Sequence, residues 1–151
     1  MLKRIREMKD QDGFTLIELM VVVLIIAILI AIAIPTFLGL RERAQNRSAT
    51  SDLRNALTGA KAFYTDGDTF TGFDAAKGEE IEPSIDFAAT GSLTEVGIVV
   101  AGDDVVVLTK QSASEDWFCA MDSGGISSVH GPEAAQTDLN DATKCAGAPA
   151  V

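Results

Sequence analysis

A long, continuous apolar tract near the start of the chain is the strongest pattern in the sequence. Sixteen consecutive residues from Leu19 to Ile34 are apolar, and the tract runs with few interruptions from Phe14 to Leu40. At 1.5 Å per residue, a helix over residues 14–40 would be about 40 Å long, which is enough to cross a hydrocarbon core of about 30 Å. We therefore predict a membrane-spanning helix. Glu18 is its one charged residue, and a carboxylate in such a segment usually has a partner.

A periodic pattern replaces the continuous one after Pro35 and Gly39. Apolar residues recur at helical spacings at Ala49, Leu53, Ala56, Leu57, Ala60, Phe63 and Tyr64. This periodicity predicts an amphipathic helix whose apolar face packs on a soluble domain. No strong stop signal separates the two patterns, so we predict one helix from about Phe14 to Tyr64. A bend or local melting is expected near residues 35–39, because Pro35 removes a backbone hydrogen bond and Gly39 adds flexibility.

The rest of the chain alternates short β-branched runs with turn residues. Asp66-Gly67-Asp68 ends the predicted helix, and residues 65–92 read as a loop with short irregular elements. Four strands are predicted, the first two forming a hairpin: Val96–Ala101, Val105–Thr109, Trp117–Met121 and Ile126–His130. Residues 131–151 read as a loop. The predicted fold class is α+β, with a long amino-terminal helix packed on a small antiparallel sheet.

The charge is distributed unevenly. The whole chain of 151 residues has a formal net charge of −10, yet residues 65–151 contain sixteen acidic residues against three lysines. Residues 35–64 carry five basic residues against two acidic ones. The acidic part should therefore be soluble and a poor ligand for nucleic acid. This length leaves room for one modest soluble domain besides the membrane segment.

Two cysteines, Cys119 and Cys145, both lie in the acidic part. A cysteine pair in a domain attached to a membrane segment suggests a disulfide in an oxidising space, and two buried free thiols are the alternative. A zinc site is less favoured, because His130 is the one histidine. Basic residues flank the apolar tract almost equally on both sides, so the cysteines decide the predicted orientation, with the carboxyl-terminal domain outside.

Three motifs that could carry chemistry have simpler explanations. Cys119 and His130 are the one possible thiol–imidazole pair, but Cys145 offers Cys119 a disulfide instead. Asp66-Gly67-Asp68 matches part of a calcium loop but lacks the other ligand positions, so a solvated turn is favoured, while a looser calcium site stays open. Asn46-Arg47-Ser48 has the form of a glycosylation sequon on the predicted helix and is interpreted as chance. No enzymatic activity and no cofactor are predicted.

Residues 1–13 are short, charged and end in glycine, so we predict a leader peptide. Cleavage after Ala31-Ile32-Ala33, as in a conventional secretory signal, is the alternative. The sequence Gly13-Phe14-Thr15-Leu16-Ile17-Glu18, followed by a long apolar helix with Pro35, resembles the type IV pilin precursor family. The resemblance covers about residues 8–40, and the remainder matches in architecture alone.

This resemblance implies how the chain is processed. A membrane-embedded prepilin peptidase would cut between Gly13 and Phe14 and methylate the new amino terminus at Phe14. Glu18 would then neutralise the terminal amine of a neighbouring subunit, or its own, during assembly. Snorkelling of the carboxylate to the membrane interface is the alternative. Cys119 and Cys145 resemble the carboxyl-terminal disulfide loop of many pilins.

The resemblance also implies a domain organisation and partners. Residues 1–13 would be the leader, 14–40 the transmembrane and polymerisation segment, 41–64 the amphipathic half of the helix, and 65–151 the globular head. The expected partners are further copies of the chain, the prepilin peptidase, the pilus assembly platform and its ATPase, and membrane lipid before assembly, with no direct contact to nucleic acid.

The expected function is that of a structural subunit of a type IV pilus. It would be held first in the cytoplasmic membrane with its head outside, and then in a cell-surface filament. A minor pilin, a type II secretion pseudopilin in a short periplasmic fibre, and a membrane-anchored adhesin or DNA-uptake receptor that never polymerises are the alternatives.

Overall fold

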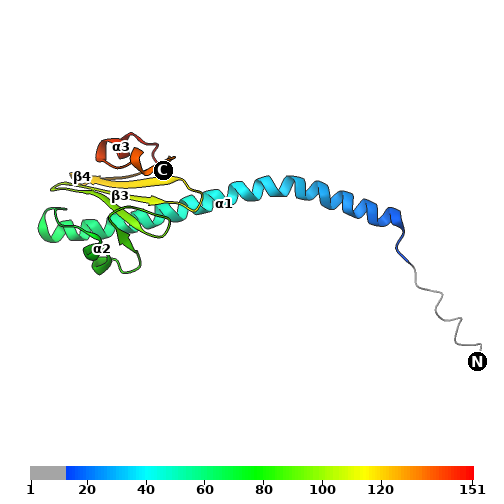
Figure 1. The fold of residues 1–151 in the computed structure, drawn as a ribbon, viewed down its shortest axis with the longest axis horizontal. Coiled ribbons are helices and arrows are strands. Elements are labelled where there is room, and N and C mark those ends of the chain that lie inside the picture. Colours follow the sequence, from blue (N-terminus) through cyan, green and yellow to red (C-terminus); the bar gives the residue numbers. More distant parts are fainter. Residues whose placement is uncertain (1–12) are drawn as a thin grey trace, which may run out of the picture. The chain divides into compact units, whose positions relative to one another are not determined.

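The structure, a computed structural model, describes residues 13–151. The chain forms two compact units that meet between Leu40 and Arg41, and helix α1 (Leu16–Gly67) contributes residues to both (Figure 1). The predicted long helix is thereby confirmed, with its ends shifted by two and three residues. The predicted leader lies outside the described residues, apart from Gly13.

The first unit contains the apolar half of α1. Every residue from Gly13 to Leu40 is exposed. Residues 35–39 are helical, so α1 is not locally melted at Pro35, whereas the bend expected there stays a prediction. The hydroxyl of Thr36 donates to the carbonyl oxygen of Ile32 at 3.1 Å, a local bond that satisfies the side chain inside the helix. Among the described residues, α1 alone is long and apolar enough to cross a membrane.

The second unit is built around the amphipathic half of α1. Leu53, Ala56 and Ala60 are completely buried, and Phe63 and Tyr64 pack against the same core. The predicted apolar face is therefore confirmed. The helix ends where Asp68 takes a positive φ of 56° and its N–H donates to the carbonyl oxygen of Tyr64 at 2.7 Å, which is a left-handed termination.

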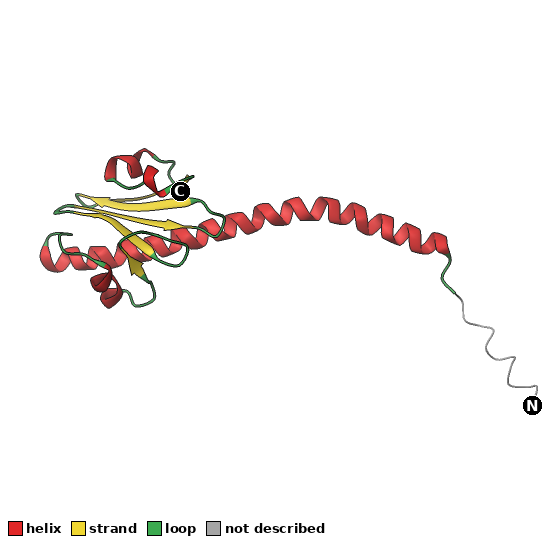
Figure 2. Ribbon diagram, in the orientation of Figure 1, coloured by secondary structure: helices red, strands yellow, loops and turns green. Residues whose placement is uncertain are grey.

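A five-stranded sheet packs on this half of α1, with its strands in sequence order (Figure 2). The strands are β1 (Phe87–Ala88), β2 (Val96–Ala101), β3 (Val105–Gln111), β4 (Trp117–Ser123) and β5 (Ile126–Glu133). Strands β2 to β5 are the four predicted strands and are antiparallel. The sequence-based expectation missed β1, a two-residue strand that pairs with β2 in parallel, so the sheet is not wholly antiparallel.

Central strand β3 is buried on both faces, as its continuous run of apolar residues requires. Val106 and Leu108 belong to the core shared with α1, while Val107 belongs to a smaller core on the other face. That smaller core also contains Cys119 and Cys145. Two cores on opposite faces explain how a small domain buries so much of one strand.

Three short helical elements replace parts of the loops expected at residues 65–92 and 131–151. They are α2 (Ala75–Ile81), η1 (Gln136–Asp138) and α3 (Ala142–Gly147). Asp74 caps α2 by accepting from the backbone N–H of Lys77 at 3.0 Å, and Asp141 caps α3 by accepting from that of Lys144 at 2.8 Å. Helix α3 covers the face of the sheet opposite α1 (Figure 1). The expectation of a loop over residues 131–151 was therefore wrong, whereas the short elements expected within residues 65–92 include the regular helix α2.

Candidate assembly site at the start of helix α1

Thr15 and Glu18 form a capping box at the first turn of α1. The backbone N–H of Thr15 donates to Oε2 of Glu18 at 2.9 Å, and the hydroxyl of Thr15 donates to the same oxygen at 2.7 Å. In return, the backbone N–H of Glu18 donates to the Thr15 hydroxyl at 3.3 Å. This reciprocal pattern satisfies backbone donors that the first turn of a helix leaves free. Glu18 therefore has a structural role that the sequence analysis did not identify.

Only one of the two carboxylate oxygens of Glu18 is used in this way. Within residues 13–151, Oε2 accepts both bonds from Thr15 and Oε1 accepts none. The carboxylate also lies at the amino-terminal end of a helix, where the helix dipole favours an anion. An ionised Glu18 can thus cap its own helix and keep one oxygen for a cation from another molecule.

The predicted processing site lies immediately before the helix. Gly13 and Phe14 precede α1, outside any helix or strand, and both are exposed, Phe14 to 91%. An accessible backbone outside regular secondary structure is a form that a peptidase active site can bind. The structure thus places Gly13, Phe14 and Glu18 within one short stretch, while processing between Gly13 and Phe14 stays a prediction.

The two cysteines form a disulfide in the head. Cys119 lies on β4 and Cys145 on α3, and both are completely buried in the smaller core beside Val107, Met121 and Leu139. The bond therefore ties α3 to the sheet. It also removes Cys119 as a nucleophile, although His130 lies opposite Cys119 on β5. The imidazole Nδ1 of His130 lies 2.9 Å from the carbonyl oxygen of Ala148 instead.

The other two motifs also have structural roles. The side chain of Asn46 donates to a carboxylate oxygen of Asp116 at 3.0 Å and accepts from the hydroxyl of Ser112 at 2.6 Å, so the sequon residue fastens the β3–β4 loop to α1. Asp66 and Asp68 lie at the end of α1 and are exposed. In the part of the chain that the structure describes, three or more potential metal-ligating side chains do not converge at any point.

An exposed apolar helix that begins with a capped glutamate, together with a disulfide-bonded α+β head, is the arrangement expected of a type IV pilin precursor. Comparison with known families agrees, because residues 8–34 match the model described as the prokaryotic N-terminal methylation motif. The chain is also 32% identical over 120 residues to the "Type IV wide pilus major component PilA4" of Thermus thermophilus, which covers 79% of this chain and 88% of that relative. The chain belongs to the type IV pilin family.

Two further relatives match over a smaller part of the chain. Identity is 46% over 61 residues to the "Type IV major pilin protein PilA" of Myxococcus xanthus, which is 40% of this chain and 28% of that protein. It is 46% over 55 residues to the "Type II secretion system core protein G" of Vibrio cholerae, which is 34% of this chain and 38% of that protein. No solved structure gave a match.

Proposed function

We propose that this chain is the principal structural subunit of a type IV pilus. It is made with a leader over residues 1–13, cut between Gly13 and Phe14 by a prepilin peptidase, and methylated at Phe14. The subunit waits in the cytoplasmic membrane with its head outside, and an assembly platform with its ATPase then polymerises it through residues 14–64. The observation that carries this proposal is the bare apolar half of α1, headed by the capped Glu18.

The apolar half of α1 cannot remain in water. Nineteen large apolar side chains between Phe14 and Leu40 are exposed. Burying one such side chain contributes about 1.5–3 kcal/mol, so covering this surface would contribute on the order of tens of kcal/mol. That exceeds the typical stability of a folded domain, which is about 5–15 kcal/mol. Lipid can cover the surface before assembly, and the same segments of neighbouring copies can cover it afterwards.

Glu18 supplies the directional contact that apolar burial lacks. Cleavage before Phe14 creates a positive amine close to an environment of low dielectric, where a charge without a partner is heavily penalised. The free Oε1 of Glu18 can accept that amine from a neighbouring copy, or from its own chain, while Oε2 keeps the cap. The carboxylate thereby favours one axial position of the incoming subunit over the others.

The extent of the similarity supports a pilus subunit over a pseudopilin. The relative that this chain covers to 88% is a pilus major component by its printed description, whereas the secretion protein G is covered to 38%. The similarity to protein G extends over 55 residues, which is 34% of this chain. A membrane-anchored adhesin that never polymerises remains a distinct alternative, and an enzyme has no support from these relatives.

Microscopy of surface filaments with a labelled antibody against the head tests the proposal. Label along the whole filament is expected for a principal subunit, sparse or terminal label would indicate a minor pilin, and a labelled cell surface without filaments would indicate an anchored protein. Intact mass of purified filaments should show a chain that starts at methylated Phe14. Filament subunits that retain residues 1–13 would contradict the processing step.

A further inference from the structure

Three arginines form a stripe along one side of the amphipathic half of α1. We define this arginine stripe as Arg43, Arg47 and Arg54, all of which are exposed. At 3.6 residues per turn their positions fall within about 40° around the helix axis, and Lys61 continues the same line. Lys61 is paired with the buried carboxylate of Asp122 at 3.1 Å, whereas no ion pair within residues 13–151 includes an arginine of the stripe.

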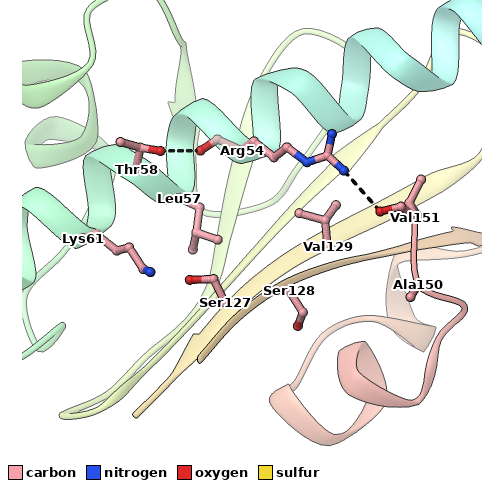
Figure 3. A pocket seen from close by; sticks show the side chains of 9 residues that line it. All are labelled: Arg54, Leu57, Thr58, Lys61, Ser127, Ser128, Val129, Ala150 and Val151. Carbon is pink, nitrogen blue, oxygen red and sulfur yellow. Dashed lines mark hydrogen bonds between the residues drawn. The ribbon is translucent and has the colours of Figure 1, made fainter. Parts of the chain in front are cut away.

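A cavity of about 480 Å³ adjoins the far end of the stripe. Arg54 and Lys61 line it on the α1 side, and Ser127 and Ser128 of β5 line it opposite (Figure 3). The guanidinium of Arg54 donates to the main-chain oxygen of Val151 at 3.2 Å, which holds it at the rim. Lys61 and Ser127 are already engaged, because both contact the carboxylate of Asp122. Arg54 is therefore the cationic side chain of this cavity that lies outside the ion pairs within residues 13–151.

The opposite side of α1 is acidic. We define the acidic flank as the carboxylates on residues 66–86, where seven acidic residues accompany one lysine: Asp66, Asp68, Asp74, Glu79, Glu80, Glu82 and Asp86. Helix α2 carries part of this flank and lies against α1 at Gly59, which approaches Ile81 and Glu82. Gly59 and Asp66 are about 140–160° around the helix axis from Arg43. Stripe and flank therefore face different directions and cannot meet within one copy.

From this arrangement we infer that the arginine stripe of one copy docks on the acidic flank of a second copy. Along the helix axis, Asp66 lies about 18 Å beyond Arg54 and about 28 Å beyond Arg47. The stripe of one copy can therefore contact the flank of another only if the two copies are displaced from each other along the axis of α1. Two different surfaces on opposite sides of one subunit make a head-to-tail contact, and such contacts produce open polymers when the rotation does not close a ring. The inference rests on the proposed polymerisation and adds its charge contact.

The length of the stripe favours a protein partner over a lipid surface. From Arg43 to Arg54 the stripe spans about 16 Å of helix, whereas the headgroup region on each side of a bilayer is about 5–7 Å thick. Lipid phosphates could reach Arg43 but not Arg54 at the same time, if the helix stands across the membrane. Nucleic acid is disfavoured because residues 65–151 carry a net charge of −13. An acidic protein surface fits the whole stripe.

Charge reversal in the full chain, expressed in its own cells, tests the contact. The triple variant Arg43→Glu/Arg47→Glu/Arg54→Glu should give about tenfold fewer surface filaments, because three exposed ion pairs together change an association constant by roughly this factor. Reversing Asp66 and Glu80 to arginine, two carboxylates that line one cavity beside α2, should lower the yield in the same way. The chain with both surfaces reversed should recover most of the wild-type yield.

The Arg41→Glu variant is the matched control, because Arg41 is exposed on the same helix but about 160° from Arg43. Its filament yield should stay near the wild-type value. Normal filaments from the triple variant, or no recovery when both surfaces are reversed, would overturn the inference while leaving the pilus function intact. Loss of the triple variant from the membrane fraction without recovery would assign the stripe to lipid instead. Absence of wild-type filaments would refute the proposed function itself.

Discussion

The disulfide between Cys119 and Cys145 allows the contribution of one covalent link to the stability of the head to be measured. The bond joins β4 to the short helix α3, whose Cys145 is completely buried in the smaller core with Val107, Met121 and Leu139. Reduction breaks the S–S bond and leaves both side chains in place. It therefore separates the covalent link from the packing around it.

The expected effect follows from the length of the closed loop. The two cysteines are 26 residues apart. In the chain-entropy model, a link closing a loop of this size contributes about 3.5 kcal/mol to the free energy of unfolding. A domain of this size is typically stable by about 5–15 kcal/mol, so the link would supply between a quarter and more than half of the total. With a urea dependence of about 1–3 kcal/mol per molar, reduction should lower the unfolding midpoint by about 1.2–3.5 M.

Tryptophan fluorescence in urea measures this shift. Trp117 is the single tryptophan of the chain and lies on β4, two residues from Cys119. Full-length protein in a nonionic detergent, with the apolar half of α1 covered, would be titrated with and without dithiothreitol. The Cys119→Ala/Cys145→Ala variant is the control, since its midpoint should be low and should not respond to the reductant.

Equal midpoints for oxidised and reduced wild-type protein would refute this reasoning, because the link would then not restrict the unfolded chain. A reductant response in the double alanine variant would show that dithiothreitol acts elsewhere. The calculation would be supported if the reduced protein unfolds at a lower urea concentration than the oxidised protein, and if its Trp117 fluorescence is native before unfolding begins.

Two further predictions concern single carboxylates. Glu18→Gln keeps a side-chain oxygen for the capping box but removes the charge, so filament yield should fall as far as in Glu18→Ala. Processing of the precursor should stay largely intact in both variants. A near-normal filament yield from Glu18→Gln would show that Glu18 acts through the cap and not through charge pairing. Burial opposes ionisation of Asp122, but the hydrogen bond from Ser127 and the ion pair with Lys61 outweigh it and hold the pKa of Asp122 below its usual 3.8. Its contribution to the free energy of unfolding is therefore present above pH 3.8 and is lost as the pH falls through the lower pKa that Asp122 has in the folded state. In the Asp122→Asn variant, the free energy of unfolding measured in urea should consequently depend less on pH in this acidic range.

The amphipathic half of α1 was predictable because its apolar side chains must all lie on one face of the helix. Leu53, Ala56 and Ala60 must all face the same sheet, so their spacing follows the helical period. The four antiparallel strands were predictable for a similar reason, as β-branched runs separated by turn residues fold locally. Each of these elements carries its own signal in adjacent residues.

The elements that were missed depend on contacts far along the chain. Strand β1 has two residues and exists because the loop before β2 passes close enough for parallel pairing, an approach that requires glycine at position 97, where a Cβ would overlap the backbone of Gly91. Helix α3 has six residues and is held by Cys145 and the cap from Asp141. A helix this short is marginal by itself, so its own sequence predicts it weakly.

The capping box was missed although its signal is present. Thr15-Leu16-Ile17-Glu18 has the spacing of a capping motif directly before an apolar run. The sequence-based interpretation of Glu18 was as a charge in a membrane segment that pairs with the terminal amine of a neighbouring subunit or of its own chain. The structure shows that one partner is three residues away, which leaves one oxygen for the intermolecular role.

Burial of the apolar half of α1 cannot by itself align two copies. Apolar association is non-directional and proportional to the covered area, so sliding or rotating one uniformly apolar helix against another changes the free energy little. Charged groups change it sharply, because an ion pair exists at one position and is broken at the next. In the proposed filament, Glu18 limits the axial shift at the start of α1, and the arginine stripe limits the rotation on its amphipathic half. Two separate charge contacts on one helix are the minimum that fixes both coordinates, which is why reversal of the stripe should impair assembly even when Glu18 is intact.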